Sequence, residues 1–260
     1  MSNPTETLFE LNHAEYSYPG RAPSLCGIDV AFRAGERICI LGANGSGKST
    51  LLKLFAGLLF PQKGRFTAFG AAVTEKRMND DRFALSYHRR VGFIFQDSDV
   101  QLFCSTVEEE IAFGLQQQAL PPQAVTERTR DMMRMLGIEP LAQRTPFQLS
   151  GGEKKKVALA SVLVMNPEVL ILDEPTNGLD PRTQVWLLRL LQSLSGAGRT
   201  LITSTHHLEL AARVADRAVL LGEDHAVAAD GPVNDLMKNT ELLKAVNLVD
   251  DSYPDTIDFS

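Results

Sequence analysis

The chain contains few cysteines. Its 260 residues include three, Cys26, Cys39 and Cys104, and each has apolar neighbours. Small secreted domains held together by disulfides instead carry a dense and even set of cysteines. The sequence therefore excludes a disulfide framework and predicts reduced thiols packed in a core.

Long apolar segments are also missing. No stretch approaches the roughly 18 uninterrupted apolar residues that a membrane-spanning helix requires. Residues 1–6 lack the basic and apolar regions of a secretion signal. We therefore expect any membrane association to occur by docking onto another protein.

Basic residues are not in excess. The chain has 26 Lys and Arg against 32 Asp and Glu, a formal net charge of −6. Proteins that bind nucleic acids need a basic face to neutralise phosphates, so we expect no nucleic-acid partner. With 44% hydrophobic residues, the chain is long enough to bury the core of one large domain or of two closely packed ones.

The most informative segment present is GANGSGKST, residues 42–50, which fits the phosphate-binding pattern G-x-x-x-x-G-K-[ST]. It follows an apolar, β-favouring run and opens an amphipathic one, so it lies between a predicted strand and a predicted helix. Its glycines allow backbone amides to surround a phosphate, and the helix start adds free donors. Lys48 would reach the β- and γ-phosphates, and Ser49 would bind Mg²⁺. The alternative is a glycine-rich turn that merely caps a helix. The residues expected to hold the nucleotide are Gly42, Asn44, Gly45, Ser46, Gly47, Lys48, Ser49 and Thr50.

A second segment, VLILDE at residues 169–174, predicts a buried parallel strand that ends in two carboxylates. Asp173 would hold Mg²⁺ through water, and Glu174 would polarise an attacking water molecule. Taken alone, an acidic pair after a strand is as often the start of an ordinary loop.

The third segment is LSGGE, residues 149–153, followed by an amphipathic run. Ser150, Gly151 and Gly152 predict a second phosphate cradle at a helix N-terminus. A serine-capped helix after a Gly-Gly turn is the simpler alternative.

Together these segments resemble the ATP-binding cassette of ABC transporters. Five elements match in the family's order: the Walker A loop at 42–50, the glutamine loop at Gln96, the signature at 149–153, the Walker B strand at 169–174 and the switch histidine at His206. The resemblance implies ATP as the nucleotide and Mg²⁺ as its metal, with Ser49, Gln96 and Asp173 as metal-binding residues. It assigns Glu174 as general base, and prefers His206 over His207 as the γ-phosphate contact.

Two further positions and one departure follow from the same resemblance. Tyr18 lies where the family stacks an aromatic ring on adenine, and Asp180 matches the family's D-loop. Glu153 stands where the family more often has Gln; a carboxylate keeps the acceptor but loses the amide donors, which places the family's ribose contact in doubt. The family pairs two subunits head to tail, with each ATP between Lys48 of one chain and Ser150 of the other.

The implied fold class is α/β: a P-loop NTPase (RecA-like) parallel-sheet core with an N-terminal antiparallel β subdomain and an inserted α-helical subdomain. Helices predicted at 107–115 and 122–136 lie where the family inserts its helical subdomain. Strands and helices then alternate from 150 to 221, as a parallel sheet requires. We divide the chain into 1–97 (β subdomain and Walker A part), 98–150 (helical subdomain), 151–240 (second part of the core) and 241–260 (acidic tail).

The segment FQDSDVQLF, residues 95–103, is similar to that of energy-coupling factor transporters. In that group the ATPases serve importers of cobalt, nickel or vitamins, and an integral membrane coupling protein docks beside the glutamine loop. Phe93, Phe95, Leu102, Phe103 and Phe113 would line this groove, although most of them would equally suit a core. We therefore expect an ATPase on the cytoplasmic face of the membrane, partnered by the coupling protein and a substrate-binding membrane subunit.

Cobalt or nickel is the preferred cargo, because a homodimer of one ATPase is more typical of the metal branch. A vitamin importer is the main alternative, since the membrane subunits that select the cargo are separate chains. A non-transport ABC ATPase is less favoured, because such proteins usually carry two cassettes or a long coiled coil, and this sequence has neither. No Asn-Lys-x-Asp or Thr-Lys-x-Asp motif is present to indicate a GTPase.

Overall fold

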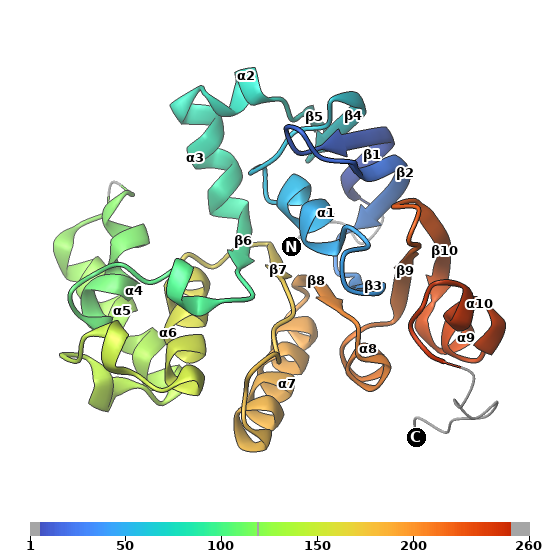
Figure 1. Ribbon diagram of the computed structural model, residues 1–260. Helices are drawn as coiled ribbons and strands as arrows, with labels where there is room; N and C mark the ends of the chain where they lie inside the picture. Colours follow the sequence, from blue (N-terminus) through green and yellow to red (C-terminus); the bar gives the residue numbers. More distant parts are fainter. Residues whose placement is uncertain (1–5, 119, 251–260) are drawn as a thin grey trace.

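The computed structural model describes residues 6–118 and 120–250, and within them two β-sheets are surrounded by helices (Figure 1). A four-stranded antiparallel sheet has the order β2-β1-β4-β5. Its strands are β1 (Thr7–Ser17), β2 (Pro23–Arg33), β4 (Lys63–Ala68) and β5 (Ala71–Ala72).

The second sheet has six strands in the order β10-β9-β3-β8-β7-β6, and all its pairs are parallel except β10 with β9. Its strands are β3 (Arg37–Leu41), β6 (Val91–Ile94), β7 (Val169–Leu172), β8 (Thr200–Thr205), β9 (Arg217–Leu221) and β10 (Val227–Pro232). Every residue of β7 and β8 is buried, as expected of central parallel strands with both faces covered. The predicted α/β class is therefore confirmed.

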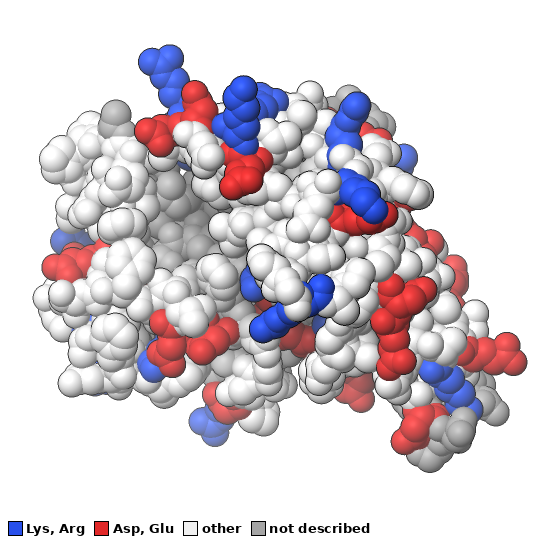
Figure 2. Space-filling view, turned by 45° about the horizontal axis from the view of Figure 1, so that its top comes forward, with Lys and Arg blue, Asp and Glu red and all other residues white. Residues whose placement is uncertain are grey.

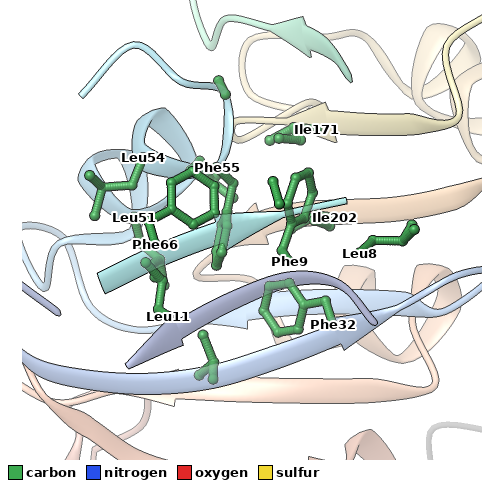
Figure 3. Close-up of a cluster of buried hydrophobic side chains, with 14 of the residues drawn as sticks. Leu8, Phe9, Leu11, Phe32, Leu51, Leu54, Phe55, Phe66, Ile171 and Ile202 are labelled. Carbon is green, nitrogen blue, oxygen red and sulfur yellow. The ribbon is translucent and has the colours of Figure 1, made fainter. Parts of the chain in front are cut away.

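Helix α1 (Lys48–Phe55) packs into the core between the two sheets (Figure 3). The ring of Phe55 contacts those of Phe9, Phe32 and Phe66, with centroids 5.0–5.9 Å apart. These tilted and edge-on contacts are favourable aromatic geometry, and all four rings are fully buried. The aromatic core thus fixes α1, and with it the loop at its N-terminus.

The other face of the parallel sheet is covered by a second apolar cluster, which includes Leu187 and Leu191 of α7. Helices α7 (Pro181–Gly196), α8 (Leu208–Val214), α9 (Val233–Met237) and α10 (Thr240–Ala245) contribute to it, as do Leu159 and Leu163 of α6 (Gly151–Leu163). The segment that we assigned to an acidic tail thus begins within α10, where Leu243 is fully buried. Residues 251–260 lie outside the described residues.

A group of helices on the left of Figure 1 has a third core of its own. It consists of α4 (Val107–Gln116), α5 (Pro122–Leu136) and α6 (Gly151–Leu163), with 3₁₀ turns η2 (Glu139–Leu141) and η3 (Pro146–Gln148). Trp186 of α7 is half-buried and packs against both this core and the cluster below the sheet. Lys156 of α6 lies over its ring, 4.9 Å from the centroid.

Between β4 and β6 the structure contains helices that the sequence did not predict, α2 (Glu75–Met78) and α3 (Asp81–Arg90). Within α3 only Tyr87 is buried, and Phe83, one turn earlier, is half-buried against the core between the sheets. A short 3₁₀ turn, η1 (Ser98–Val100), follows β6. Basic and acidic side chains are interspersed on the face shown in Figure 2.

Candidate nucleotide-binding site

The loop between β3 and α1 has a backbone that requires glycine at two positions. Gly47 has φ +104°, and a Cβ there would lie 2.4 Å from the carbonyl oxygen of Ser24. A Cβ on Gly42 would lie 2.4 Å from Ser46 Oγ and 2.9 Å from the carbonyl oxygen of Leu221. The loop is therefore packed tightly against Ser24 and Leu221, and a side chain at Gly42 or Gly47 would not fit there.

A pocket of about 320 Å³ opens in front of this loop. Its size is that of a small-molecule site. The residues that line it are Ser24, Asn44, Gly45, Gly47, Lys48, Ser49, Thr50, Gln96, Glu174, Asn177 and His206. Residues predicted from four separate sequence motifs thus meet in one cavity, while Gly42 and Ser46 are buried behind it.

Lys48 is buried and turned back onto its own loop. Its Nζ donates hydrogen bonds to the carbonyls of Gly42 (2.8 Å) and Ala43 (3.0 Å) and lies 3.6 Å from Glu174 Oε1. A buried ammonium requires such partners, because its desolvation is otherwise costly. An incoming phosphate would offer Lys48 a new counter-charge in place of Glu174.

Glu174 is held in a rarely used backbone conformation, with φ +41°. Its N–H donates to Ser204 Oγ (3.0 Å), and its Oε1 lies 2.9 Å from His206 Nδ1. His207 stacks on His206 and lines a neighbouring pocket instead. Of the two histidines, the structure therefore brings His206 to Glu174.

The oxygen donors in and beside the pocket fit Mg²⁺. They are the Ser49 hydroxyl, the Gln96 amide oxygen and the Asp173 carboxylate, whose Oδ1 accepts a hydrogen bond from Ser204 Oγ (2.6 Å). The described residues contain no group of three or more His, Cys, Asp or Glu that could hold a metal by themselves. Mg²⁺ usually binds through one or two carboxylates together with water and substrate phosphates, as this donor set would allow.

The signature residues lie outside this pocket. Ser150 is exposed and caps α6: its N–H and its Oγ each donate to Glu153 Oε2 at 2.8 Å, and its Oγ accepts from Glu153 N–H at 3.4 Å. These bonds lower the pKa of Glu153. The carboxylate that replaces the family's usual Gln is therefore engaged with Ser150 within its own chain.

The D-loop residue lies beside the signature helix. Asp180 caps α7 by accepting hydrogen bonds from the N–H groups of Arg182 (2.9 Å) and Thr183 (3.1 Å). A Cβ on Gly152 would lie 2.8 Å from Thr183 Oγ1, so α6 and α7 meet closely at their N-termini. Asp180 and the signature do not line the pocket that contains Lys48.

Tyr18 lies beside α1, with its hydroxyl 3.5 Å from Thr50 Oγ1. Tyr16 supports it edge-on, with ring centroids 5.1 Å apart. The half-buried Tyr18 ring is thus held next to the phosphate loop, where it can offer a π-face to a base.

We expect Tyr18→Ala to weaken ATP binding about ten- to hundredfold, because base stacking on an aromatic ring contributes roughly 1–3 kcal/mol. Tyr18→Phe should bind ATP almost normally, since it keeps the ring. Titration with a fluorescent ATP analogue measures both affinities. If Tyr18→Ala binds normally while Tyr16→Ala does not, Tyr16 is the stacking residue.

Lys155 is a functional candidate that the sequence interpretation missed. It is 2% exposed, and its Nζ donates to the carbonyls of Phe95 (3.0 Å) and Gln96 (3.1 Å). Burial lowers its pKa to about 8, against the opposing effect of Asp173 and Asp97. The sequence could have indicated Lys155, because it lies one helical turn before the apolar Ala158 and Leu159 and therefore on the buried face of α6. No sequence motif indicated Ser24 or Asn177, which also line the pocket.

Comparison with known proteins identifies the family of the chain. Residues 25–177 match the family described as "ABC transporter". The nickel import ATP-binding protein NikO of Rhodobacter capsulatus is 48% identical over 244 residues, which cover 93% of this chain and 95% of NikO. The energy-coupling factor transporter ATP-binding protein EcfA of Methanothermobacter thermautotrophicus is 38% identical over 241 residues, 93% of this chain and 76% of EcfA.

A solved structure is similar over nearly the whole chain. It is cbiO1 from Clostridium perfringens, described as part of the ABC transporter complex cbiONQ, with a TM-score of 0.78 and 33% identity over 93% of this chain and 95% of cbiO1. Among the described residues, no helix is both long and apolar enough to cross a membrane.

Proposed function

The chain belongs to the ABC transporter family as an ATPase, and on this basis we propose that it powers an energy-coupling factor importer of nickel or cobalt. The observation that carries the proposal is the convergence of Lys48, Glu174, His206 and Gln96 on one pocket, beside a segment of the energy-coupling factor type. The nickel import relative, similar over nearly its full length, supports a metal cargo.

Hydrolysis at this site would require two copies of the chain. Ser150 is exposed and lies outside the pocket of its own chain, so it is free to face the ATP held by Lys48 of a second copy. A symmetric head-to-tail dimer would complete both sites at once. ATP would stabilise this dimer until the ATP is hydrolysed, and hydrolysis would then allow the two copies to separate.

Within the completed site each residue has a separate task. Lys48 would bind the β- and γ-phosphates, and Glu174 would orient a water molecule and accept its proton. His206 holds Glu174 in place at 2.9 Å and would contact the γ-phosphate. When bound, Mg²⁺ would neutralise phosphate charge, held by Ser49, Gln96 and, through water, Asp173.

An exposed aromatic pair lies beside the glutamine loop. The side chains of Phe103 and Phe113 are 61% and 42% exposed, and their rings meet edge-on with centroids 4.9 Å apart. Glu110 is buried, and its Oε2 accepts hydrogen bonds from the N–H groups of Phe103 (2.8 Å) and Cys104 (2.7 Å). A buried carboxylate thus fixes the loop so that Phe103 remains at the surface.

The other residues of the predicted groove are less exposed. Leu102 is buried in the helical core, and Phe93 packs against the core between the sheets. Phe95 is half-buried against Phe93, with centroids 4.7 Å apart. We therefore propose that Phe103 and Phe113 form the contact for a short helix of the integral membrane coupling protein, which would hold the ATPase peripherally on the cytoplasmic face.

The variant Phe103→Glu should separate the ATPase from its membrane complex. A carboxylate placed in an apolar contact costs at least about 1–3 kcal/mol, so co-purification with the membrane subunits should fall roughly tenfold or more. Nickel uptake by cells that carry this variant should fall in parallel. ATP binding by the isolated chain should be unchanged, because the Walker A loop is built from other elements.

Met135→Glu is the matched control, since Met135 is 57% exposed and lies at the end of α5. It should co-purify normally. Wild-type yield with Phe103→Glu would reject the docking contact, and uptake of a vitamin in place of the metal would support the alternative importer type. If no membrane subunit co-purifies even with the wild-type chain, a non-transport ATPase becomes the better assignment.

A further inference from the structure

Three side-chain bridges attach residues 95–101, the glutamine-loop segment, to helix α6. Lys155 Nζ bonds the carbonyls of Phe95 and Gln96, Lys154 forms an ion pair with Asp99, and Gln101 Nε2 donates to the carbonyl of Ala158 at 3.1 Å. The same Gln101 accepts a hydrogen bond from the N–H of Phe95 through its Oε1 at 3.3 Å. The segment is therefore bonded along its length to one face of the signature helix.

The attachment begins where the sheet ends. Strand β6 pairs with β7 as far as Ile94, whose carbonyl accepts the N–H of Asp173 at 3.0 Å. At the next two residues the carbonyls point to Lys155 instead. The boundary between the part held by the sheet and the part held by α6 thus lies between Ile94 and Phe95.

The bridge through Lys155 differs from the other two in its burial. The Lys154–Asp99 pair is partly solvated, with side chains 17% and 53% exposed, and such pairs contribute little. Lys155 is 2% exposed, so breaking its bonds to the two carbonyls would leave a buried ammonium without those partners. Lys155 is therefore the dominant connection between α6 and the backbone of Gln96.

We infer that α6 and residues 95–101 move as one unit, and that Lys155 is the positioning residue that sets the place of Gln96. This inference rests on the proposed dimer, in which the N-terminus of α6 meets the ATP of the partner. Engagement of Ser150 would then fix the position of Gln96 in the pocket of the same chain. The position of the signature segment in each chain would therefore be coupled to the position of Gln96, the expected metal contact of that chain.

Lys155→Met tests the positioning role, because it keeps much of the volume and removes the donors. We expect the kcat for ATP hydrolysis to fall about ten- to hundredfold, as for displacement of a site residue by about 1 Å, while the Kd for ATP stays within about twofold. The Mg²⁺ concentration for half-maximal turnover should rise. Lys155→Arg should restore activity, since it can donate to both carbonyls. Lys156→Met is the matched control, because Lys156 lies over Trp186 and should leave the kcat unchanged.

A cross-link tests the motion directly and does not depend on the folding of Lys155→Met. Asp99→Cys and Lys154→Cys in one chain, with the three native cysteines replaced, can be joined by a short bifunctional thiol reagent. Turnover within about twofold of the uncross-linked protein supports a single unit, since a link between parts that do not separate removes nothing from the cycle. Loss of turnover on cross-linking, or an unchanged kcat in a folded Lys155→Met, would overturn the inference.

These measurements use ATP hydrolysis by the purified chain, so an error in the cargo or the membrane partner would not affect them. An error in the proposed dimer would appear separately, as a failure of Glu174→Gln to dimerise with ATP.

Discussion

Replacing Glu174 by Gln should reduce ATP turnover about a hundred- to ten-thousandfold, because an amide cannot accept the proton of the attacking water. Binding of ATP should persist or strengthen. The Glu174 carboxylate lies 3.6 Å from Lys48 Nζ, so it competes with the phosphates for this ammonium. Glutamine keeps the shape and removes that competition.

Because Glu174→Gln should bind ATP without hydrolysing it, we expect this variant to accumulate as an ATP-bound dimer. Size-exclusion chromatography with light scattering should show a dimer for Glu174→Gln with ATP and a monomer without it, while phosphate release gives the turnover. Glu127→Gln, an exposed change on α5, is the control and should behave like the wild type. Near-normal turnover in purified Glu174→Gln would remove Glu174 from its role as general base.

Lys48→Ala should affect the earlier step and weaken ATP binding about a hundredfold or more, because it deletes charge-assisted hydrogen bonds to the phosphates worth roughly 1.5–3 kcal/mol each. The loss should be large for a second reason. Without Lys48 the buried Glu174 carboxylate has no ammonium beside it and repels the incoming phosphates.

Isothermal titration with ATP measures this loss, and thermal unfolding checks that the variant is folded. Lys53→Ala, on the same helix, is the control and should bind ATP normally. Unchanged ATP affinity in Lys48→Ala would contradict the assignment of Lys48 to the phosphates, whatever the effect on turnover.

The fold could be predicted where the sequence carries strong local patterns. The helix at 122–136 has the predicted bounds, because a Pro at its start and a Gly after its end mark them. Membership of the ABC family is likewise confirmed, since it rests on motifs fixed by phosphate chemistry, and so is the energy-coupling factor resemblance, which rests on the segment 95–103.

Some parts of the fold were not predicted. Helix α3 was missed although Asp80 caps it by accepting the N–H of Phe83 at 3.0 Å, and although Phe83 and Tyr87, one turn apart, pack against the same core. The segment assigned to the acidic tail begins within α10, where Leu243 is buried.

At the site, the sequence could supply residue types but not their partners. The contact of His206 with Glu174 joins two strand ends and depends on a backbone torsion at Glu174 that no pattern encodes. Ser24 lines the pocket from β2, and its carbonyl oxygen lies 2.4 Å from the position that a Cβ on Gly47 would take. The roles of the predicted residues in catalysis remain predictions for the variants above.

The placement of Trp186 gives the protein a built-in optical probe. It is the single tryptophan of the chain, half-buried at the seam where the helical core meets the cluster below the parallel sheet, with an ammonium over its ring. Indole emission responds to nearby charge and to water, so a rotation of the helical group against the sheet would change the spectrum without any added label. Stopped-flow emission could therefore time the closing of the cassette, and Lys156→Met would show how much of the signal comes from the cation.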